Sequence, residues 1–245
     1  MTENRKRTIL VLQHISCEPP AVYEEILKSR DYLIHRVELD EGEPLPQHLD
    51  FAAMIVMGGP MGALDDEEHP WLKAEREYIA RAVDAGMPYW GVCLGAQLLA
   101  ASLGSRIYKG SNPEVGTYPV GLSQEATNDP VFGGLPEDFS VFQWHSDTFD
   151  LPNGAVRLAE SDLYENQAFA YGSAYGVQFH VEVGADLASE WADVASYRDA
   201  LESLYGPDGT RDVLGKLAAT AESNRSLATT IFEAWLERFV DDRRN

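Results

Sequence analysis

The sequence contains little cysteine, little lysine and an excess of acid over base. Its 245 residues include two cysteines, Cys17 and Cys93, which are too few to form the disulfide framework of a secreted domain. The 19 basic residues face 40 acidic ones, for a formal net charge of −21. This balance disfavours binding to nucleic acid or to an anionic membrane through Lys and Arg. Residues 1–7 are polar and no apolar signal segment follows them, so we expect a cytoplasmic protein with reduced thiols.

Long uncharged stretches are also scarce, and the exception is informative. Residues 85–105 contain no charged side chain, which formally allows a membrane span. The stretch includes Pro88, Gln97 and four glycines, and it fits a strand, a sharp turn and a helix better. Hydrophobic residues make up 44% and aromatic residues 10% of the chain, which is typical of a globular protein and excludes a disordered acidic one.

The first half of the chain alternates short apolar runs with amphipathic stretches. The runs predict strands at residues 8–12, 33–39, 52–57 and 87–92. The amphipathic stretches predict helices over residues 21–30 and around 71–83. Such alternation is typical of right-handed crossover units around a parallel sheet.

The pattern changes after about Arg106. Short strand-like pieces separated by turn residues predict antiparallel strands at residues 118–122, 140–144, 155–159, 167–171 and 175–179. From Asp186 the composition is helical, with a break at residues 205–209 and a last helix that ends near Val240. No repeat or linker divides the chain, so we expect one domain over residues 1–245, with a core at about 8–185 and a helical extension at 186–245.

One cysteine lies in a pattern typical of a nucleophile. In Gly91-Val92-Cys93-Leu94-Gly95 the thiol ends an apolar strand and begins a helix, with a glycine two residues away on each side. A strand that turns abruptly into a helix leaves no room for neighbouring side chains. The helix N-terminus also favours a thiolate. The alternative is that Cys93 is a small buried hydrophobe.

A second pattern pairs a base with a carboxylate. In the predicted strand Tyr175-Gly-Val-Gln-Phe-His-Val-Glu182, His180 and Glu182 are two residues apart and project from the same face. Glu182 could then hold one imidazole nitrogen while the other faces a thiol. The alternative is a histidine at a strand end beside a solvated carboxylate.

Three motifs in this order resemble the class I, or triad, glutamine amidotransferases, especially stand-alone members similar to the amidotransferase domain of GMP synthase. They are Gly58-Gly59-Pro60, Gly91-Val-Cys-Leu-Gly-Ala-Gln97 and Gln178-Phe-His-Val-Glu182. The resemblance covers about residues 9–182. It implies a three-layer α/β/α flavodoxin-like fold, with a mostly parallel central sheet and antiparallel additions.

The resemblance also implies roles for individual residues. Cys93 corresponds to the nucleophile, His180 to the general base and acid, and Glu182 to the carboxylate that orients it. The N–H groups of Gly59 and Leu94 correspond to the oxyanion hole, in which backbone donors stabilise a developing negative charge. The implied substrate contacts are Gly58, Gln97, Gln143, Trp144, His145 and Ser146. Glu114 and Gly116 correspond to an acidic loop before the next strand.

Other interpretations of the same residues are weaker. Val181 stands where the family usually has proline, but the alternation of His180 and Glu182 survives this change. His145 with Asp147 could form an alternative base and orienter, although they lie in a segment that we expect to be rich in turns. The glycines at 58–62 lack the spacing of a dinucleotide fingerprint and the lysine of a P-loop. No His or Cys cluster has ligand spacing, so we expect neither a cofactor nor a metal.

The expected function is hydrolysis of the side-chain amide of glutamine through a thioester on Cys93, with ammonia passed to a separate synthase. A free-standing hydrolase of another γ-glutamyl compound is the first alternative, and a catalytically idle relative is the second. Only about 60 residues follow Glu182, too few for an ammonia-accepting synthetase domain. The sequence does not identify the acceptor, the partner or the oligomeric state.

Overall fold

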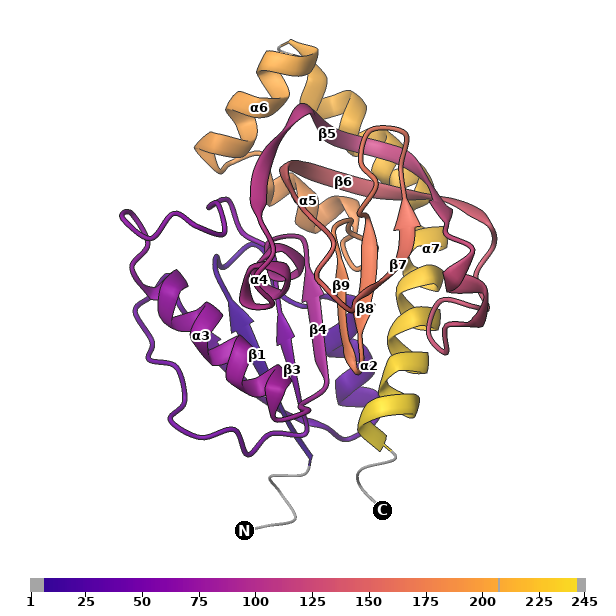
Figure 1. Ribbon diagram of the computed structural model, residues 1–245. Coiled ribbons are helices and arrows are strands. Elements are labelled where there is room, and N and C mark those ends of the chain that lie inside the picture. The colour runs from indigo at the N-terminus through magenta and orange to yellow at the C-terminus, as the bar shows by residue number, and fades with distance from the viewer. Residues whose placement is uncertain (1–6, 207, 242–245) are drawn as a thin grey trace.

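The computed structural model describes residues 7–206 and 208–241. Predictions that concern residues 1–6, the polar N-terminal segment among them, lie outside this range. Within it, nine strands form one sheet in the order β2-β1-β3-β4-β9-β8-β7-β5-β6. Helices cover both faces of this sheet (Figure 1). The predicted flavodoxin-like α/β/α arrangement with antiparallel additions is confirmed.

The parallel part of the sheet comes almost entirely from the first half of the chain. Its strands are β1 (Thr8–Gln13), β2 (Leu33–Glu38), β3 (Ala53–Val56), β4 (Tyr89–Val92) and β9 (Ala174–Val177). Each pairs in parallel with its neighbour in the sheet. All residues of β3, β4 and β9 are buried, as expected for strands that helices cover on both faces. The predicted strands in this part are confirmed, apart from the length of the last one.

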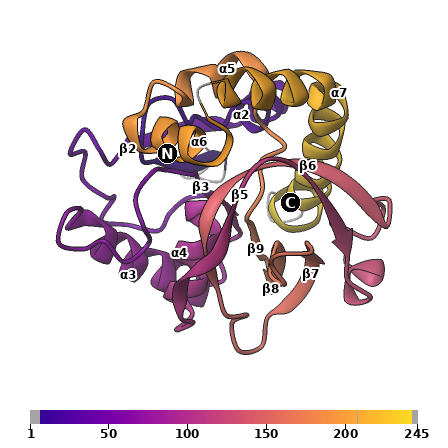
Figure 2. The same ribbon diagram turned by 90° about the horizontal axis from the view of Figure 1, so that it is seen from above.

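The antiparallel part is larger than the sequence predicts. It contains β5 (Ile107–Leu122), β6 (Asp138–Phe149), β7 (Val156–Glu160) and β8 (Ala168–Tyr171), and a short 3₁₀ helix at Glu125–Asn128 precedes β6. The long β5 and β6 form a ribbon that arches away from the other strands (Figure 2). The expected pieces at 118–122 and 140–144 were too short because Gly110, Asn112 and Pro113 resemble a turn. In the structure they form a bulge between Lys109 and Glu114, and the pairing with β6 resumes beyond it.

Two hydrophobic cores lie on the two faces of the sheet. Alternate residues of β1 divide between them: Ile9 and Val11 pack toward α2 (Val22–Ser29) and α7 (Gly209–Trp235). Leu10 and Leu12 pack toward α3 (Trp71–Asp84) and α4 (Leu94–Ser102). This period of two is what places one helical layer on each face.

The C-terminal segment is helical, as predicted. It forms α5 (Ala185–Trp191), α6 (Ala195–Tyr205) and α7, followed by a π-helical turn at Leu236–Val240. The predicted break lies between Tyr205 and Gly209, where Gly206 adopts a φ of 70°. Figure 1 shows α6 beyond the end of the sheet toward which β1, β3 and β4 point. Open α/β sheets bind ligands at this end.

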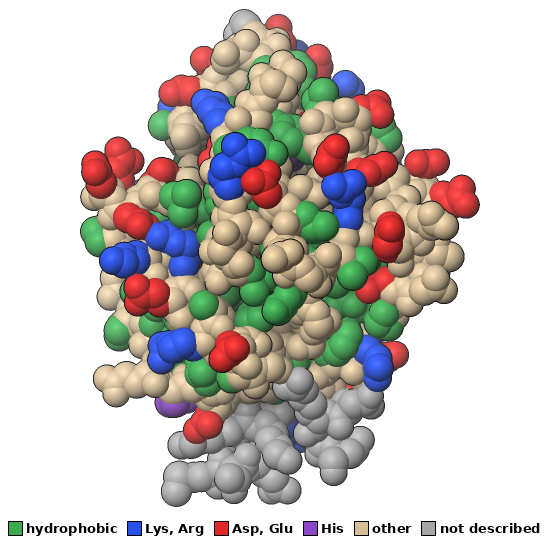
Figure 3. All heavy atoms as spheres, in the orientation of Figure 1, with side chains coloured by type: hydrophobic (Ala, Val, Ile, Leu, Met, Phe, Trp, Pro, Cys, Tyr) green, Lys and Arg blue, Asp and Glu red, His purple; other side chains and the backbone are tan. Residues whose placement is uncertain are grey.

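The surface agrees with the composition. Asp and Glu side chains are spread over the face shown in Figure 3 and do not gather in one patch. Among the described residues, no helix is both long enough and apolar enough to cross a membrane. The uncharged run at 85–105 forms β4, a sharp turn at Cys93, and α4.

Candidate active site

The chain reverses direction at Cys93 in a strained turn. β4 ends at Val92 and α4 begins at Leu94, and Cys93 between them has φ 51° and ψ −105°. A Cβ atom at position 95 would lie 2.1 Å from the carbonyl oxygen of Val56, and one at position 91 would lie 2.7 Å from that of Gly95. The backbone therefore approaches too closely for any residue but glycine at 91 and 95. This is the packing that the spacing of the motif predicts.

His180 and Glu182 form a buried pair. Nδ1 of His180 and Oε1 of Glu182 are 2.8 Å apart, and at most 2% of either side chain is exposed. The second carboxylate oxygen accepts the N–H of Val181 at 3.0 Å. The ring of Trp191 packs edge-on against that of His180, with the ring centres 4.8 Å apart. Glu182 thus holds one imidazole nitrogen, which leaves the other free to act on a neighbour.

The strand predicted to carry this pair is shorter than expected. β9 ends at Val177, because its parallel neighbour β4 has turned into the elbow, where the N–H of Cys93 donates to the carbonyl of Val177 at 2.8 Å. His180 is joined instead to β6, through an isolated antiparallel bridge with Phe142. The prediction of one continuous strand to Glu182 is therefore wrong, although the two side chains do meet.

The pKa of His180 is raised well above its ordinary value. Burial is the largest influence and lowers it, because a charged imidazolium loses its hydration. The charge of Glu182, together with hydrogen bonds to Cys93 and Glu182, outweighs burial. Glu182 and Cys93 together therefore favour the imidazolium form of His180.

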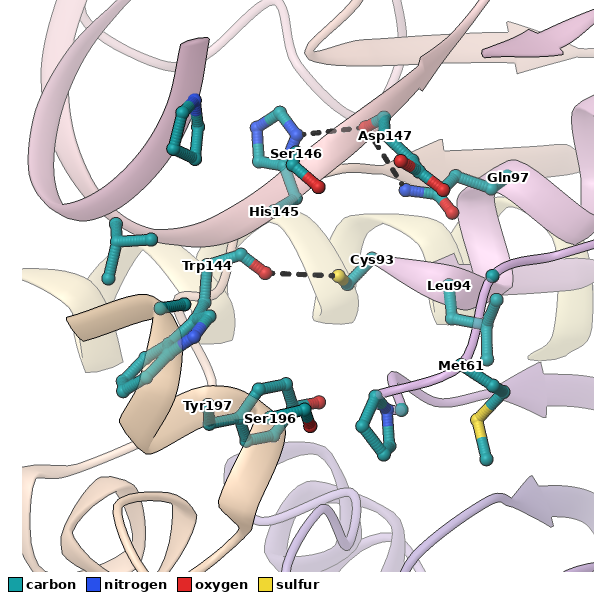
Figure 4. Close-up of a pocket in the computed structure, with 16 residues that line it drawn as sticks. Met61, Cys93, Leu94, Gln97, Trp144, His145, Ser146, Asp147, Ser196 and Tyr197 are labelled. Atoms are coloured by element: carbon teal, nitrogen blue, oxygen red, sulfur yellow. Dashed lines mark hydrogen bonds between the residues drawn. The ribbon is translucent and has the colours of Figure 1, made fainter. Parts of the chain in front are cut away.

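The thiol also contacts residues from two other elements. The side-chain amide of Gln178 donates to Cys93 Sγ at 3.5 Å, and Sγ lies 3.9 Å from the carbonyl oxygen of Trp144 (Figure 4). Gln97, one turn along α4, donates to the carbonyl oxygen of Asp147 at 3.2 Å and to Oε1 of Gln178 at 3.1 Å. Gln178 therefore links the elbow helix to the thiol. The sequence motif includes it, but only the structure reveals this contact.

A cavity of about 240 Å³ opens beside the thiol. Its lining comes from the loop after β3, from the elbow, from β5 and β6, and from α6, and it contains neither Lys nor Arg. In Figure 4, Cys93 and Leu94 lie across the cavity from Trp144, and Ser196 and Tyr197 of α6 enclose it from a third side. The described lining offers a small ligand backbone groups, amides and apolar surface.

Most of the predicted substrate contacts line the cavity. Gln97, Trp144, His145 and Ser146 line the cavity together with Gly59 and Leu94. Gln143 is fully buried and its amide donates to Oε1 of Gln167 at 2.8 Å, away from the cavity lining. The side chain of Gln143 therefore packs within the sheet, and its predicted contact with the substrate, which is through the backbone of residues 143–147, stays a prediction.

His145 and Asp147 do not form a base and its orienter. They lie in the strand β6 and not in a turn-rich segment. His145 Nδ1 contacts the backbone oxygen of Asp147 at 3.0 Å, and Nε2 contacts the carboxylate of Glu114 at 3.0 Å. Glu114 is buried and also accepts hydrogen bonds from Gln167 and Ser161. This network holds the β5–β6 wall of the cavity in place.

Two residues near the site escape sequence analysis. Glu18 follows β1, is 2% exposed and accepts a hydrogen bond from Tyr197 of α6. A Cβ atom on Gly58 would lie 2.1 Å from Oε2 of Glu18 and 3.4 Å from Cε1 of His180, so Glu18 lies beside the catalytic histidine candidate. The sequence could have indicated Glu18, because it lies just beyond the carboxyl end of a predicted parallel strand, where ligands bind. Nothing in the sequence indicates a role for Tyr197 at the site.

The site contains no cluster suited to a metal. Among residues 7–206 and 208–241, no group of three His, Cys, Asp or Glu side chains is arranged to hold a metal ion. Cys93 and Leu94, the first residue of α4, line the cavity, and the buried pair of His180 and Glu182 lies outside the lining. Such a set can form and break an acyl–sulfur bond.

Comparison with known proteins gives consistent matches. The model of the family glutamine amidotransferase class-I matches residues 23–190. The glutamine amidotransferase-like protein YfeJ of Salmonella typhimurium is 33% identical over 174 residues, which cover 69% of this chain and 73% of that protein. The glutamine-hydrolyzing subunit of the GMP synthase of Natronomonas pharaonis is 33% identical over 156 residues, covering 62% of this chain and 78% of that one. A solved glutamine amidotransferase from Thermotoga maritima is 35% identical with a TM-score of 0.83, covering 96% of this chain and 98% of that one.

Proposed function

Because the chain belongs to the class I glutamine amidotransferase family, we propose that it hydrolyses the γ-amide of glutamine through a thioester on Cys93. The observation that carries this proposal is the strained Cys93 at φ 51°, next to a His180 whose other nitrogen is held by Glu182 at 2.8 Å. A nucleophile beside a base that a third group orients is the arrangement that covalent acyl transfer requires.

In the first step, the thiolate of Cys93 attacks the amide carbon and a C–S bond forms, while the carbonyl oxygen becomes an oxyanion. The N–H groups of Gly59 and Leu94 donate to this oxyanion, and each such donor contributes roughly 3–4 kcal/mol. The C–N bond then breaks as His180 gives its proton to the nitrogen. Ammonia leaves, and the γ-glutamyl group remains as a thioester.

In the second step, the neutral His180 removes a proton from water. The resulting hydroxide attacks the thioester carbon, the C–S bond breaks, and glutamate leaves with a regenerated thiolate beside an imidazolium. The raised pKa of His180 suits this cycle, because the resting site keeps the proton that the leaving nitrogen needs. Glu182 stabilises that charge and keeps the ring orientation through both steps.

Substrate binding in this proposal uses the backbone of β6 and the elbow helix. Trp144, His145 and Ser146 would offer backbone groups to the amino and carboxylate ends of the substrate, with Gly58 and Gln97 closing the γ-amide end. The side-chain amide of Gln97 already holds Asp147 and Gln178. We therefore assign Gln97 to shaping the cavity as well as to contact.

A variant of the thiol tests the reaction. We expect Cys93→Ala to lose release of glutamate and ammonia from glutamine by about 10⁴-fold or more, as when the nucleophile of a catalytic triad is removed. Cys17→Ala is the matched control: the other free thiol is 8% exposed and packs in the cluster under α5 and α7, so the protein should keep most of its turnover. Full turnover by the Cys93 variant would contradict the mechanism.

The fate of the ammonia is a further part of the proposal. The GMP synthase relatives are glutamine-hydrolyzing subunits, and by analogy a separately encoded synthase would receive the ammonia of this protein. One observation favours a second candidate, in which the leaving group is a larger amine. Apolar residues line the cavity, namely Met61, Pro113, Val115 and Ala200, and ammonia needs no such surface.

Assays of the isolated protein separate these two candidates. A synthase subunit should hydrolyse glutamine in preference to γ-glutamyl amides of larger amines, and its rate should rise when its synthase is added. A free-standing hydrolase should prefer a γ-glutamyl amide with an apolar amine and need no partner. Rapid partner-free turnover of such an amide, with glutamine a poor substrate, would rule out the first candidate.

A further inference from the structure

A further buried His–Glu pair lies behind the glycine loop, apart from His180–Glu182 and His145–Glu114. His14 follows β1 directly and Glu75 lies on α3, and both side chains are fully buried. Nε2 of His14 is 3.0 and 3.2 Å from the two carboxylate oxygens of Glu75. Its other nitrogen, Nδ1, is 3.0 Å from the carbonyl oxygen of Gly58. The ring stacks on Trp71, with 5.6 Å between ring centres.

Both contacts of His14 need a proton on the ring. The carboxylate of Glu75 and the carbonyl oxygen of Gly58 only accept hydrogen bonds, and a neutral imidazole has one N–H to give. Burial lowers the pKa of His14 most strongly, but the charge and hydrogen bonds of Glu75, the contact with Gly58 and the charge of Glu18 together leave it raised. His14 is therefore an imidazolium that donates to both acceptors at once.

The contact with Gly58 determines where the next N–H points. The described residues contain no cis peptide bond, so the carbonyl of Gly58 and the N–H of Gly59 lie on opposite sides of one planar unit. A Gly-Gly segment has little conformational preference of its own, and this orientation needs an external restraint. His14 is close enough to give it: a Cβ atom on Gly59 would lie 2.9 Å from His14 Cβ and 3.2 Å from Leu94 Cδ2.

We propose that His14 is a positioning residue: its hydrogen bond to the carbonyl of Gly58 turns the N–H of Gly59 toward the cavity as an oxyanion donor, and Glu75 holds His14 in place. This inference rests on the proposed amide hydrolysis. It adds a chain of contacts that runs from α3 through the end of β1 to the loop beside Cys93. The pair then serves the transition state without touching the substrate.

Two amide substitutions separate this role from simple packing. In His14→Asn, the side-chain nitrogen stands where Nδ1 was, so the donor to Gly58 remains and the contact with Glu75 is lost. In His14→Gln, the nitrogen stands where Nε2 was, so the contact with Glu75 remains and the donor to Gly58 is lost. We expect His14→Gln to lower kcat by roughly 10–100-fold with little change in KM, since loss of an oriented oxyanion donor acts on the transition state. His14→Asn should lose less than about tenfold.

A measurement that needs no turnover decides the structural half of the inference. The ¹³C resonance of the Gly58 carbonyl reports the hydrogen bond that this oxygen accepts. We expect it to move in His14→Gln and to stay near the wild-type position in His14→Asn. If the wild-type protein hydrolysed no γ-glutamyl amide, the proposed function would fail while this measurement still tested the restraint.

A higher activity of His14→Gln than of His14→Asn would overturn the inference. If the pair only stabilised the fold, His14→Gln, which keeps the contact between α3 and β1, would be the more active of the two, or both would fall equally. Should either variant fail to fold, Glu75→Gln replaces it, because its amide can donate to Nε2 of a neutral imidazole and so keeps the ring proton on Nδ1, where it donates to Gly58. The Gly58 carbonyl resonance and kcat should then stay near the wild-type values, and a loss of kcat as large as that of His14→Gln with an unmoved resonance would contradict the proposal.

Discussion

Two sides of the cavity are held in place by different kinds of contact. The thiol wall consists of residues 59–62 with Cys93, Leu94 and Gln97, and it is held by backbone contacts. The N–H of Cys93 donates to β9, and the Cα atoms of Gly91 and Gly95 are packed against neighbouring backbone. Larger side chains at these positions would therefore move the thiol. The thiol wall is therefore suited to a fixed reaction geometry.

The helical wall is α6, with Ser196, Tyr197 and Ala200 on its cavity side. Side-chain contacts hold it: Tyr197 donates to Glu18, and Tyr205 donates to the carbonyl of Val115 at 2.6 Å. Leu201 is its one fully buried residue among those described. Because single side chains hold α6, its residues can be substituted one at a time without moving the thiol wall. Under the proposed function, the thiol wall would carry the chemistry and the helical wall would select among γ-glutamyl compounds.

The largest expected effect follows from a methyl group placed in the thiol wall. Gly95→Ala would bring a Cβ atom to 2.1 Å from the Val56 carbonyl oxygen, and because that atom belongs to the backbone of β3 it cannot rotate away. We expect the free energy of unfolding to fall by about 3 kcal/mol or more, together with most of the activity. Chemical denaturation and turnover of glutamine measure the two losses.

Gly215→Ala is the matched control, since this glycine also lies inside a helix, in α7. A Cβ atom there would meet nothing within 4 Å, and the better helix propensity of alanine should raise stability by up to about 1 kcal/mol. Equal effects of the two substitutions would mean that the thiol wall does not depend on this close approach of backbone.

A smaller effect is expected in the helical wall. Tyr197→Phe removes the hydroxyl that donates to Glu18 and leaves a buried carboxyl oxygen without that partner. The cost of such a loss is roughly 1–3 kcal/mol, and we expect kcat/KM to fall about tenfold, chiefly through KM. Amides of α6 should also exchange faster with solvent.

Tyr205→Phe provides the comparison within the same helix. Its hydroxyl binds Val115 and Tyr118 at the outer end of α6, where the side chain is 46% exposed. It should weaken the helix with a smaller change in KM than Tyr197→Phe. If Tyr197→Phe lowered kcat and left KM unchanged, the helical wall would belong to the catalytic machinery.

The sequence predicts the local features of the site but not the contacts between distant segments. The elbow has a local signature: two glycines around a cysteine mark the turn, and Gly91 packs against the backbone of Gly95 within the same five residues, although Gly95 itself packs against Val56 of β3. The pairing of His180 with Glu182 is also local, and it survives even though β9 ends three residues before His180. Alternation along an extended backbone is enough to bring such neighbours together.

Contacts between distant parts of the chain could not be predicted. Tyr197 and Glu18 are 179 residues apart, and His14 reaches Glu75 across 61. Each of these residues is ordinary in its own segment: Tyr197 has the appearance of a helix packing residue, and His14 stands near Cys17 with no second cluster at metal-ligand spacing. Their roles depend on how α3 and α6 pack onto the sheet ends, which periodicity and spacing do not encode.

The smallest expected effect concerns Glu18, where the two walls join. Burial raises the pKa of its carboxyl group and Glu182 adds to this, against the opposing influence of His180, Tyr197 and His14. Above the ordinary value of 4.5, the native protein therefore binds a proton that the unfolded chain has released. Its free energy of unfolding must then fall as the pH rises through this window.

Glu18→Gln removes that titration and keeps an oxygen to accept the hydroxyl of Tyr197. We expect the variant to gain stability relative to the wild type as the pH rises from 4.5, by at most about 1.4 kcal/mol per pH unit. His14 and His180 also have raised pKa values, so the wild type and the variant should both lose stability above pH 6.5. Because Glu18 titrates together with these two histidines, the difference in stability between the two proteins reports on all three groups. Denaturation curves between pH 4.5 and 8 measure it. A constant difference across that range would mean that Glu18 is already charged in the native protein, which would contradict the raised pKa of its carboxyl group.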